Sequence, residues 1–443
     1  MEINSENIKV VKFGGSSLAD AEHFKKVGDI IRADKTRVFV IPSAPGKRFK
    51  EDEKVTDMLY TCYNEVTETG KLGESFEKMK ERFNLIIEGL GLDFDLSDEF
   101  EHIGWAITHH AGRDYAASRG EYLNGLILSK YLGYDFIDPA ECVRFFDNGV
   151  FDSELTNTLL SDELKKHDNG VIPGFYGSMP NGTIRTFSRG GSDITGSIVS
   201  RAVMADMYEN WTDVNGFLTA DPRIVDNPAQ IQYITYRELR ELSYMGAGVL
   251  HEDAIFPVRF AGIPINIRNT NEPENKGTMI VSHTDVYDTK NIITGVAGKK
   301  GFCVITIEKA MMNSETGFGR KVLEAIEHEG LSFEHLPSGI DTMSVVLNAA
   351  DMKPCREKLI NRLCHAVEPD SIAVEEGLAL IAVVGRAMVK AKGTAFRVFE
   401  AIARAGINIK MIDQGSSEYN IIIGVDEKDF EDATRAIYNE FVK

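Results

Sequence analysis

The sequence predicts an α/β protein whose mostly parallel sheet is followed by two copies of a βαββαβ unit. Three observations predict this fold class. Short apolar, β-branched runs alternate with amphipathic helical patterns up to about residue 283, as in βαβ units. These apolar runs are continuous rather than alternating, which suits strands covered on both faces. The last third of the chain contains an internal repeat.

The first βαβ unit lies at the N-terminus. Ile8–Phe13 is a β-branched run that stops at two glycines, a helical pattern follows from Leu18 to Ile31, and Arg37–Ile41 is a second apolar run. Strand, glycine turn, helix and strand in this order predict two parallel strands joined by a helix.

Later segments extend the same pattern. We expect further buried strands at Gly170–Ser178 and Pro264–Asn269, and a charged, solvent-facing helical stretch between Tyr60 and Asp98. The polar, turn-rich segment Asn271–Lys290 predicts a domain boundary.

An offset of 76 residues aligns two segments beyond that boundary without a gap. The following pairs of residues become equivalent: Val322 and Val398, Ile326 and Ile402, Gly330 and Gly406. Each copy reads as strand, loop, amphipathic helix, glycine stop, two strands of a hairpin, and a second helix. Two copies are too few for a solenoid. Duplicated packing without any ligand stays open as an interpretation.

Length and composition limit the possible functions. With 443 residues, the chain is too long for one ordinary core. Its formal net charge of −19 disfavours nucleic acid and anionic membranes as partners. It has no apolar run of about 20 residues, which excludes a spanning helix. The five cysteines form no CxxC pair, so we expect free thiols in a reducing cytoplasm and no metal site.

The N-terminal motif KFGGSS covers Lys12–Ser17, between the predicted strand and helix. Glycines there allow backbone N–H groups to approach an oxyanion, and the start of a helix adds a positive partial charge. Lys12 could reach the oxygens of a transferring phosphate. The motif matches neither a Walker loop nor a dinucleotide loop. A tight turn without a ligand is an equally good interpretation.

Two further motifs contain charged residues beside glycines. TFSRGGSD (Thr186–Asp193) offers Arg189, whose guanidinium can bind a carboxylate through two hydrogen bonds, and Asp193, which could anchor a lysine or a metal. ENWTDVNGFLTADPR (Glu209–Arg223) predicts a strand, a glycine turn and the wall of a nucleotide pocket. Taken singly, a capped turn and a surface hairpin remain alternatives.

Together, the motifs KFGGSS, SAPGK with VTD, SRGEYLN, SRGGSD and WTDVNGFLTADPR resemble those of aspartate kinases, in the same order and over nearly the whole chain. The repeat resembles the paired ACT domains of these enzymes. The resemblance implies the amino-acid-kinase fold, a carbamate-kinase-like αβα sandwich, followed by two ferredoxin-like ACT domains. We therefore expect a catalytic domain at 1–283, a linker at 284–300, and ACT domains at 301–370 and 371–443. The last segment could instead complete the first ACT domain.

The resemblance also implies an activity. ATP, with Mg²⁺, would phosphorylate L-aspartate to 4-phospho-L-aspartate, the first step of lysine, threonine and methionine biosynthesis. A carboxylate is already ionised at pH 7, so such a site needs alignment and charge neutralisation but no general base.

Roles pass from the family to the matching residues. Lys12 would stabilise the transferring phosphoryl group, and Asp193 would orient Lys12. Arg189 would clamp a carboxylate of aspartate, and Glu121 would pair with its ammonium group. The other substrate contacts would be Ser43, Thr56, Gly190, Gly191 and Ser192. The contacts to ATP would be Lys12, Gly14, Gly15, Ser16, Thr212, Asp213, Leu218, Arg223, Gly248 and Val249.

The sequence departs from the family pattern on the nucleotide side. Leu218 stands where relatives often have tyrosine. GAGVLHE places Gly248 and Glu252 where many relatives have the lysine and the proline of GAKVLHP. These departures concern the affinity for the nucleotide rather than the type of reaction.

In relatives, a loop and strand of the first ACT copy hold the feedback amino acid at an interface between ACT domains. The matching residues are Met312, Ser314, Gly317, Phe318, Gly319, Ser332, Glu334 and Ser338. We expect lysine as the effector, with threonine as the second candidate, and a homodimer formed through the ACT domains.

Two classes of alternative remain. One is a kinase of glutamate, acetylglutamate or UMP on the same fold; Arg189 with Glu121 favours a free α-amino acid over the last two. The other is a non-catalytic amino-acid sensor, which would have no use for Lys12 and Asp193. The adjacent residues His109 and His110 are more typical of a helix surface than of a metal site.

Overall fold

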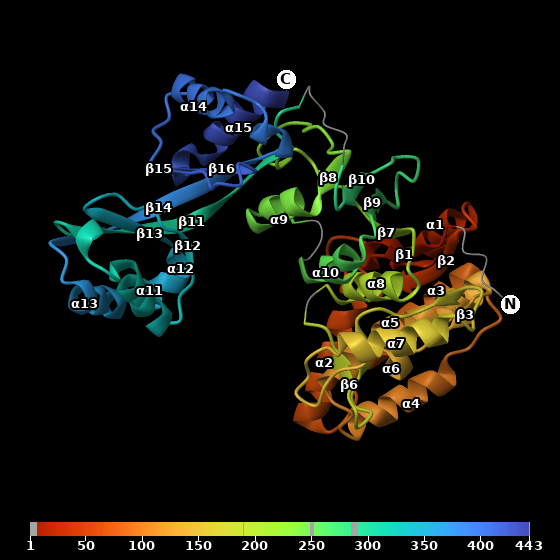
Figure 1. Ribbon diagram of the computed structural model, residues 1–443. Coiled ribbons are helices and arrows are strands. Elements are labelled where there is room, and N and C mark those ends of the chain that lie inside the picture. The colour runs from red at the N-terminus through yellow and green to blue at the C-terminus, as the bar shows by residue number, and fades with distance from the viewer. Residues whose placement is uncertain (1–6, 189, 249–251, 285–290, 443) are drawn as a thin grey trace. The chain divides into compact units, whose positions relative to one another are not determined.

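The computed structural model of the protein describes residues 7–188, 190–248, 252–284 and 291–442 (Figure 1). The chain divides into two compact units, and it passes between them several times. The first unit contains Met1–Phe217, Gln232–Tyr236 and Val249–Thr284. The second contains Leu218–Ile231, Arg237–Gly248 and Asp285–Lys443. The linear domain bounds stay a prediction.

The first unit is built on an eight-stranded sheet with the order β3-β4-β2-β1-β7-β9-β10-β8 in the described residues. All neighbouring strands are parallel except β9 and β10. The strands are β1 (Lys9–Phe13), β2 (Arg37–Pro42), β3 (Asp135–Phe136), β4 (Gly170–Val171), β7 (Met207–Thr212), β8 (Tyr233–Thr235), β9 (Ile265–Asn269) and β10 (Thr278–Val281). A separate hairpin joins β5 (Tyr176–Ser178) and β6 (Ile184–Thr186).

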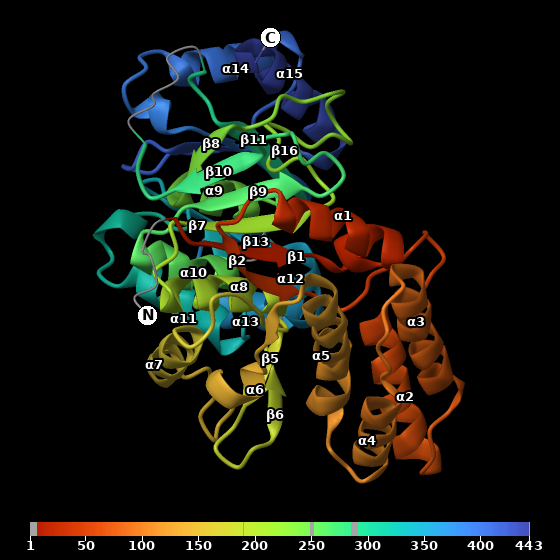
Figure 2. The ribbon, with the colours of Figure 1, turned by 90° about the vertical axis from the view of Figure 1, so that its right-hand side faces the viewer.

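Helices pack around this sheet in two groups, which Figure 2 shows side by side. One group has α8 (Gly191–Ala202) against β1, β2 and β7, and α8 also packs on α7 (Ser153–Leu164) and α10 (Glu252–Ala261). The other group has α5 (Arg113–Leu132) against β2 and β4. Packed with α5 are α1 (Ala21–Arg32), α2 (Val55–Thr69), α3 (Glu74–Leu90) and α4 (Ser97–Thr108). A short helix, α6 (Pro139–Cys142), packs on β5.

The secondary structure differs from the sequence predictions at three places in this unit. The GGSS segment forms a 3₁₀ turn, η1 (Gly15–Leu18), and α1 begins only at Ala21, because Asp20 caps it through the backbone N–H of His23. Gly170–Ser178 is two strands rather than one, since Pro173 lacks a ladder donor. Asn271–Lys290, which we expected to be turn-rich, contains strand β10.

The stretch Tyr60–Asp98 is not solvent-facing throughout. Its helices bury one face, and α3 places Phe76, Met79, Phe83 and Ile86 in the main core of the unit. Their spacing of three and four residues is that of an amphipathic helix, whose charged residues occupy the other face.

The second unit contains a six-stranded sheet with the order β12-β13-β11-β14-β16-β15. Figure 1 shows the long strands β11 (Gly295–Glu308) and β14 (Ser371–Val384) running between two helix pairs. The other strands are β12 (Phe333–His335), β13 (Thr342–Asn348), β15 (Met411–Asp413) and β16 (Asn420–Asp426). The helices are α11 (Phe318–His328), α12 (Ala349–Met352), α13 (Arg356–Val367), α14 (Thr394–Arg404) and α15 (Phe430–Val442), with 3₁₀ turns η2 (Met312–Ser314), η3 (Lys353–Cys355), η4 (Arg386–Val389) and η5 (Glu427–Asp429).

Two hydrophobic cores divide this sheet. One core joins α11 and α13 to residues such as Cys303 of β11 and Ile372 of β14. The other joins α14 and α15 to the segment Ile293–Val296 and to Ile381 of β14. Both long strands therefore serve both copies of the repeat, and β11 begins inside the range that we predicted as a linker.

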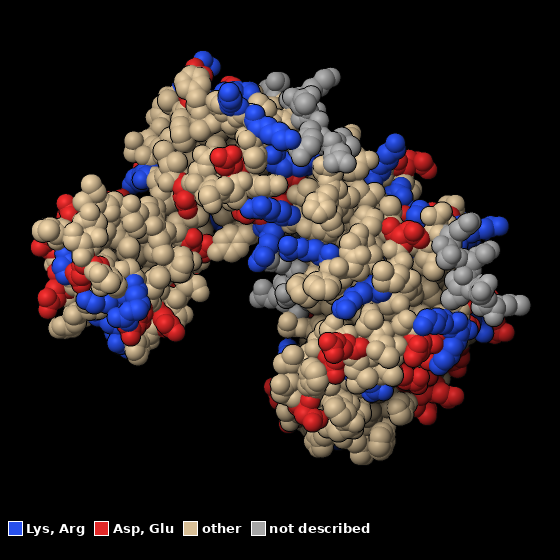
Figure 3. Space-filling view, viewed as in Figure 1, with Lys and Arg blue, Asp and Glu red and all other residues tan. Residues whose placement is uncertain are grey.

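Two segments from the middle of the chain also belong to the second unit. Helix α9 (Tyr236–Tyr244) carries Glu238, which is fully buried. Arg386 Nη1 donates to both carboxylate oxygens of Glu238, to Oε1 at 3.2 Å and to Oε2 at 3.0 Å. The segment Leu218–Ile231 places Ala220 and Val225 against Tyr438 of α15. On the face seen in Figure 3, acidic and basic side chains are interspersed.

Candidate active site

The first glycine turn lies at the carboxyl end of β1. The Gly14 N–H donates to the carbonyl oxygen of Trp211 on β7 at 3.0 Å. Gly15 meets the SAPGK loop after β2, because the Gly46 N–H donates to its carbonyl oxygen at 2.8 Å. A Cβ atom on Gly15 would lie 2.7 Å from the carbonyl oxygen of Ala44, so only glycine fits there. Two loops thus touch at one edge of the parallel sheet, where α/β proteins bind ligands.

Lys12 is buried, and its ammonium group sits in a small polar cluster. Its Nζ lies 2.6 Å from Asp193 Oδ1, in the first turn of α8, and donates to Asn210 Oδ1 of β7 at 3.4 Å. The amide of Asn210 donates to the same oxygen of Asp193 at 2.9 Å. Nζ would also be 3.7 Å from a Cβ atom on Gly14. The positive charge of Lys12 therefore lies at the glycine turn.

The loop that carries Arg189 follows the β5–β6 hairpin. Arg189 itself lies outside the described residues. Gly190 caps α8 in the left-handed conformation with φ 58°, and Gly191 packs against Phe175, where a Cβ atom would come within 2.4 Å of the ring. Ser192 is buried in the same turn. Asp114 of α5 accepts from the backbone N–H of Thr186 at 3.2 Å, which fixes the hairpin to α5.

Helix α5 also carries Glu121, whose carboxyl group is buried. Burial raises the pKa of Glu121 to about 8, against smaller opposing effects from the Ala44 backbone N–H and the nearby Arg119 charge. Its Oε2 atom has no hydrogen-bond partner among the described residues. A buried, unpartnered carboxylate oxygen is costly unless a cationic ligand completes it.

The predicted substrate donors lie near this helix. Ser43 follows β2, its N–H donates to the Phe13 carbonyl at 3.1 Å, and its carbonyl accepts from Asn124 Nδ2 of α5 at 2.7 Å. Thr56 is half-buried in the first turn of α2. The structure thus brings Ser43 beside the loop of Gly15 and beside α5.

The predicted nucleotide residues divide between the two units. Thr212 ends β7 and Asp213 follows it; the Thr212 hydroxyl lies 3.2 Å from Asp213 Oδ1. Leu218, Arg223 and Gly248 belong to the second unit, where Arg223 is exposed and pairs with Asp221 at 2.6 Å. Val249 lies outside the described residues.

The predicted effector loop lies in the first copy of the repeat. Met312 and Phe318 are buried, and Ser314 is exposed. Gly317 caps α11 in the left-handed conformation with φ 83°, and Gly319 lies in the first turn of that helix. Glu315 of this loop pairs with Lys309 at 2.6 Å and with Lys321 at 2.7 Å.

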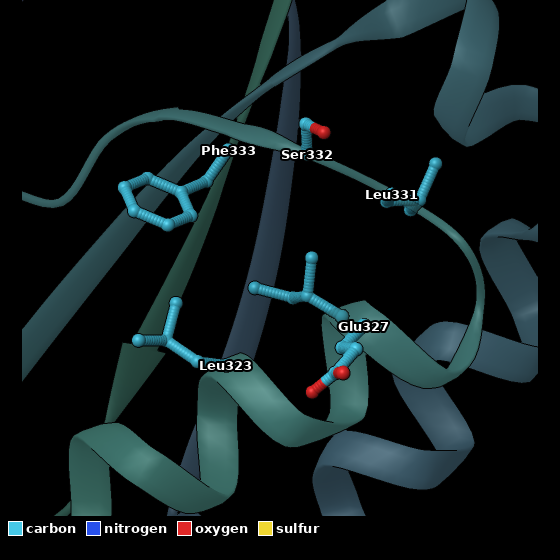
Figure 4. A pocket seen from close by; sticks show the side chains of 6 residues that line it. Leu323, Glu327, Leu331, Ser332 and Phe333 are labelled. Carbon is cyan, nitrogen blue, oxygen red and sulfur yellow. The ribbon is translucent and has the colours of Figure 1, made fainter. Parts of the chain in front are cut away.

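The other predicted effector residues lie on and after β12. Ser332 lines a cavity of about 430 Å³ between the second half of α11 and β12, together with Leu323, Ile326, Glu327, Leu331 and Phe333 (Figure 4). Glu334 accepts a hydrogen bond from the Tyr244 hydroxyl of α9. Ser338 is exposed, and its hydroxyl donates to the Leu336 carbonyl at 3.2 Å. Residues 312–319 do not line this cavity.

Sequence reasoning missed Asn210 and Tyr244. Asn210 stands inside a quoted motif, but nothing in its spacing distinguishes it from a core residue. Tyr244 lies 90 residues from its partner Glu334. Within the described ranges, no group of three His, Cys, Asp or Glu residues could hold a metal ion. No helix in the same ranges is long and apolar enough to cross a membrane.

Comparison with known proteins gives two family matches. Residues 7–269 match the amino acid kinase family, and residues 381–441 match an ACT domain. Aspartokinase 3 of Bacillus subtilis is 39% identical over 449 residues, which cover 98% of this chain and 98% of that protein.

Solved structures show the same likeness. The crystal structure of Clostridium acetobutylicum aspartate kinase has a TM-score of 0.93 and 52% identity, and the match covers 98% of this chain and all of that one. Escherichia coli aspartokinase III, in complex with aspartate and ADP in its R-state, has a TM-score of 0.75 at 24% identity, with coverage of 98% and 100%. At that identity the second likeness concerns the fold alone.

Proposed function

Because the chain belongs to the amino acid kinase family, and within it to the aspartokinases, we propose that the loops at the carboxyl edge of the parallel sheet form its active site. The enzyme is an aspartate kinase, a phosphotransferase with a carboxyl group as acceptor. It converts ATP and L-aspartate to ADP and 4-phospho-L-aspartate. The fold class and the family predicted from the sequence are confirmed.

The observation that carries the site proposal is the buried ammonium group of Lys12 at the glycine turn. It faces Gly14 and is held by Asp193 and Asn210. A fixed cation at a glycine turn suits a transferring phosphoryl group. Gly15 and Ser16 would complete this cradle.

The second half of the proposal concerns aspartate. Glu121 has a buried oxygen without a partner in the described residues, which suits the ammonium group of the substrate. Arg189, from its sequence position, would clamp a carboxylate. Ser43, Thr56 and the turn Gly190–Ser192 would donate the remaining hydrogen bonds.

The chemical step follows from these positions. An oxygen of the side-chain carboxylate forms a bond to the γ-phosphorus of ATP, and the bond from that phosphorus to the β–γ bridging oxygen breaks. The electron pair of the broken bond leaves on ADP, and no proton is transferred. Lys12 stabilises the charge on the transferring oxygens.

The nucleotide would be contacted by Thr212, Asp213, Leu218, Arg223, Gly248 and Val249. Mg²⁺ suits this chemistry because it is held largely by phosphate oxygens and waters, with few protein ligands. Asp193 would be the ligand that the chain offers, because its carboxylate lies beside Lys12 Nζ at the glycine turn. When bound, Mg²⁺ neutralises phosphate charge.

The test is a coupled assay of ADP release, with the acyl phosphate trapped by hydroxylamine. Aspartate should give the hydroxamate, whereas glutamate and N-acetylglutamate should give little. Equal or better turnover of glutamate would overturn the substrate assignment. Lys12→Ala should lower kcat by about 10²-fold, and Arg189→Ala should mainly raise KM for aspartate. Near-normal kinetics of both variants would reject the assigned roles.

For regulation, we propose lysine as the feedback effector, with threonine as the second candidate. The backbone N–H groups at the start of α11 suit the effector's carboxylate, and Glu334 suits its ammonium group. A homodimer through the ACT domains would be the regulated unit. Sedimentation with and without each amino acid, beside inhibition curves, tests both statements. No response at millimolar concentrations would contradict them.

The five cysteines are free thiols in the structure. They support our proposal that the enzyme is cytoplasmic, because thiols stay reduced in the cytoplasm. Fractionation of cells with an antibody to the chain tests this placement, and recovery in a secreted fraction would contradict it.

A further inference from the structure

We propose that Asn210 is a positioning residue for the phosphoryl transfer and acts through Lys12. This inference rests on the proposed function, since it concerns the same site. The inference goes beyond the proposed function because no sequence motif assigned a role to Asn210.

The geometry places Asn210 between the two charged members of the cluster. Its side chain is buried, with 4% of the residue exposed, and lies on β7 next to β1. Its Oδ1 accepts from Lys12 Nζ at 3.4 Å, and its Nδ2 donates to Asp193 Oδ1 at 2.9 Å. The amide orientation is thus fixed by a donor on one side and an acceptor on the other.

The contacts to Lys12 explain why a neutral amide suits this position. A lysine ammonium has three N–H donors. Nζ donates one of them to Asn210 Oδ1 and forms an ion pair with Asp193 Oδ1. It also lies beside Gly14, where a further N–H can point toward the glycine turn. A second carboxylate here would add negative charge beside the incoming phosphate, and an apolar side chain would leave Lys12 held by Asp193 alone.

Asn210 also restrains Asp193. The hydrogen bond from Asn210 and the ion pair with Lys12 converge on Oδ1 of that carboxylate, so the carboxylate is held from two directions. The Tyr208 hydroxyl donates to the backbone carbonyl of Asp193 at 3.2 Å and fixes the same turn of α8. Losing Asn210 would therefore allow both Asp193 and Lys12 to rotate, and a small misplacement of a preorganised charge slows the reaction strongly.

The experiment uses Asn210→Leu, which keeps the branching of the side chain but none of its hydrogen bonds, and Asn210→Asp in the full-length enzyme. Both should lower kcat by about 10- to 100-fold, while KM for aspartate and for ATP changes less than about threefold. Asn210→Asp should be at least as slow as Asn210→Leu. Asn266→Leu is the matched control: Asn266 is equally buried on the neighbouring strand β9, and it donates to the Lys276 carbonyl at 3.1 Å, away from the cluster. It should keep the normal kcat of its folded fraction.

A double variant separates positioning from mere packing. If Asn210 acts through Lys12, Lys12→Ala with Asn210→Leu should be no slower than Lys12→Ala alone, because coupled residues are not additive. Additive losses, or a normal kcat of Asn210→Leu with thermal stability intact, would overturn the inference. If Lys12→Ala itself had normal kcat, the proposed function of Lys12 would fail instead. If Asn210→Leu fails to fold, Asn210→Asp takes its place, alone and combined with Lys12→Ala, and the same outcomes apply.

Discussion

Glu121 is the residue that we propose to bind the ammonium group of the substrate. Its carboxyl group is buried without a full set of partners, and burial raises its pKa to about 8. At pH 7 the free site therefore holds a proton on Glu121. An aspartate ammonium would replace that proton, because a nearby positive charge favours the ionised carboxylate.

This exchange predicts a pH dependence of substrate binding. Binding of aspartate releases one proton below about pH 8, so KM for aspartate should fall as pH rises toward 8, by up to about tenfold per pH unit. Above that pH it should level off. Glu121→Gln should raise KM by about 10- to 100-fold and remove the dependence. Steady-state kinetics from pH 6 to 9 measure both, and an unchanged slope in the variant would contradict the assignment.

The same shift predicts the stability of the free enzyme. The folded-state pKa lies above the ordinary value, so the stabilisation that Glu121 gives is complete below pH 4.5 and is lost as pH rises toward 8. Thermal unfolding of the wild type should therefore show a decline across this window that Glu121→Gln lacks.

Single residues also show what could be read from the sequence. The family resemblance implied that Asp193 orients Lys12, and the structure shows the two residues as an ion pair at 2.6 Å. The contacts of Asn210 could not be predicted, since they involve two residues 198 and 17 positions away that meet it only in the fold.

At the scale of elements, the glycine turn and the SAPGK loop depend on each other. Their backbones approach so closely that a Cβ atom on Gly46 would lie 2.6 Å from the backbone carbon of Gly15. The guanidinium of Arg82 on α3 holds the SAPGK loop through the Gly46 carbonyl at 2.7 Å and Asp52 at 2.7 Å. Arg82 lies in the stretch that we expected to face solvent.

We therefore expect Gly15→Ala to damage catalysis more than stability. The new methyl group must push the backbone at Ala44 and Gly46, which would displace the cradle, so kcat should fall by about 10²-fold. Gly415→Ala is a control for the loss of a glycine, because a Cβ atom there meets nothing within 4 Å. Initial rates and melting temperatures compare the two variants, and a normal kcat for Gly15→Ala would show that the two loops can separate freely.

Helix α9 comes just before the GAGVLHE segment in the sequence, and its side chains contact the repeat. It meets Arg386 through Glu238, Asn420 through Glu241 at 2.6 Å, and Glu334 through Tyr244. An effector ammonium on Glu334 would have to displace the Tyr244 hydroxyl. The hydrogen bond could therefore pass the arrival of the effector to α9.

Tyr244→Phe tests this coupling. The variant should bind lysine at least as tightly, since Glu334 no longer has to exchange partners, but its maximal inhibition should weaken by about 1 kcal/mol of coupling. Calorimetry measures the binding and steady-state assays the inhibition. If binding and inhibition changed in parallel, Tyr244 would contribute to the effector site and not to its transmission.

Helices and strands were largely predictable where a pattern within the segment itself determines them. The strands near Ile8–Phe13 and Arg37–Ile41 and the duplicated helices were found from their periodicity. The division at Pro173 and the burial of α3 were missed, because they depend on long-range packing. The sharing of β11 and β14 between the two copies was not predicted, because the sequence analysis treated each copy of the repeat as one continuous segment.

At the scale of the molecule, the C-terminal helix shapes a segment that we assign to ATP binding. Tyr438 packs on Ala220 and Val225, its hydroxyl accepts from the Ala229 N–H at 3.1 Å, and Arg435 donates to the Ile224 carbonyl at 3.1 Å. These contacts surround Arg223 without involving its side chain.

Tyr438→Ala should therefore impair nucleotide binding without affecting aspartate. We expect KM for ATP to rise by about tenfold, equivalent to about 1.4 kcal/mol, while KM for aspartate stays unchanged. Phe399→Ala, which removes a partly buried side chain from the neighbouring core, is the control. Each KM is measured with the other substrate at saturation. An equal rise in both KM values would contradict a selective effect on ATP and would indicate a general loss of structure.

The two long shared strands affect how the protein is made. The core around α11 and α13 uses residues between 303 and 374, so it can close soon after that stretch leaves the ribosome. The other core combines Ile293 and Val296 with residues as late as Phe441. The start of β11 can pair with β14 once Val384 has been made. Its apolar face stays uncovered until the last helix of that core is translated, at about 5–20 residues per second. During synthesis the apolar face around residue 295 therefore needs protection from other nascent chains.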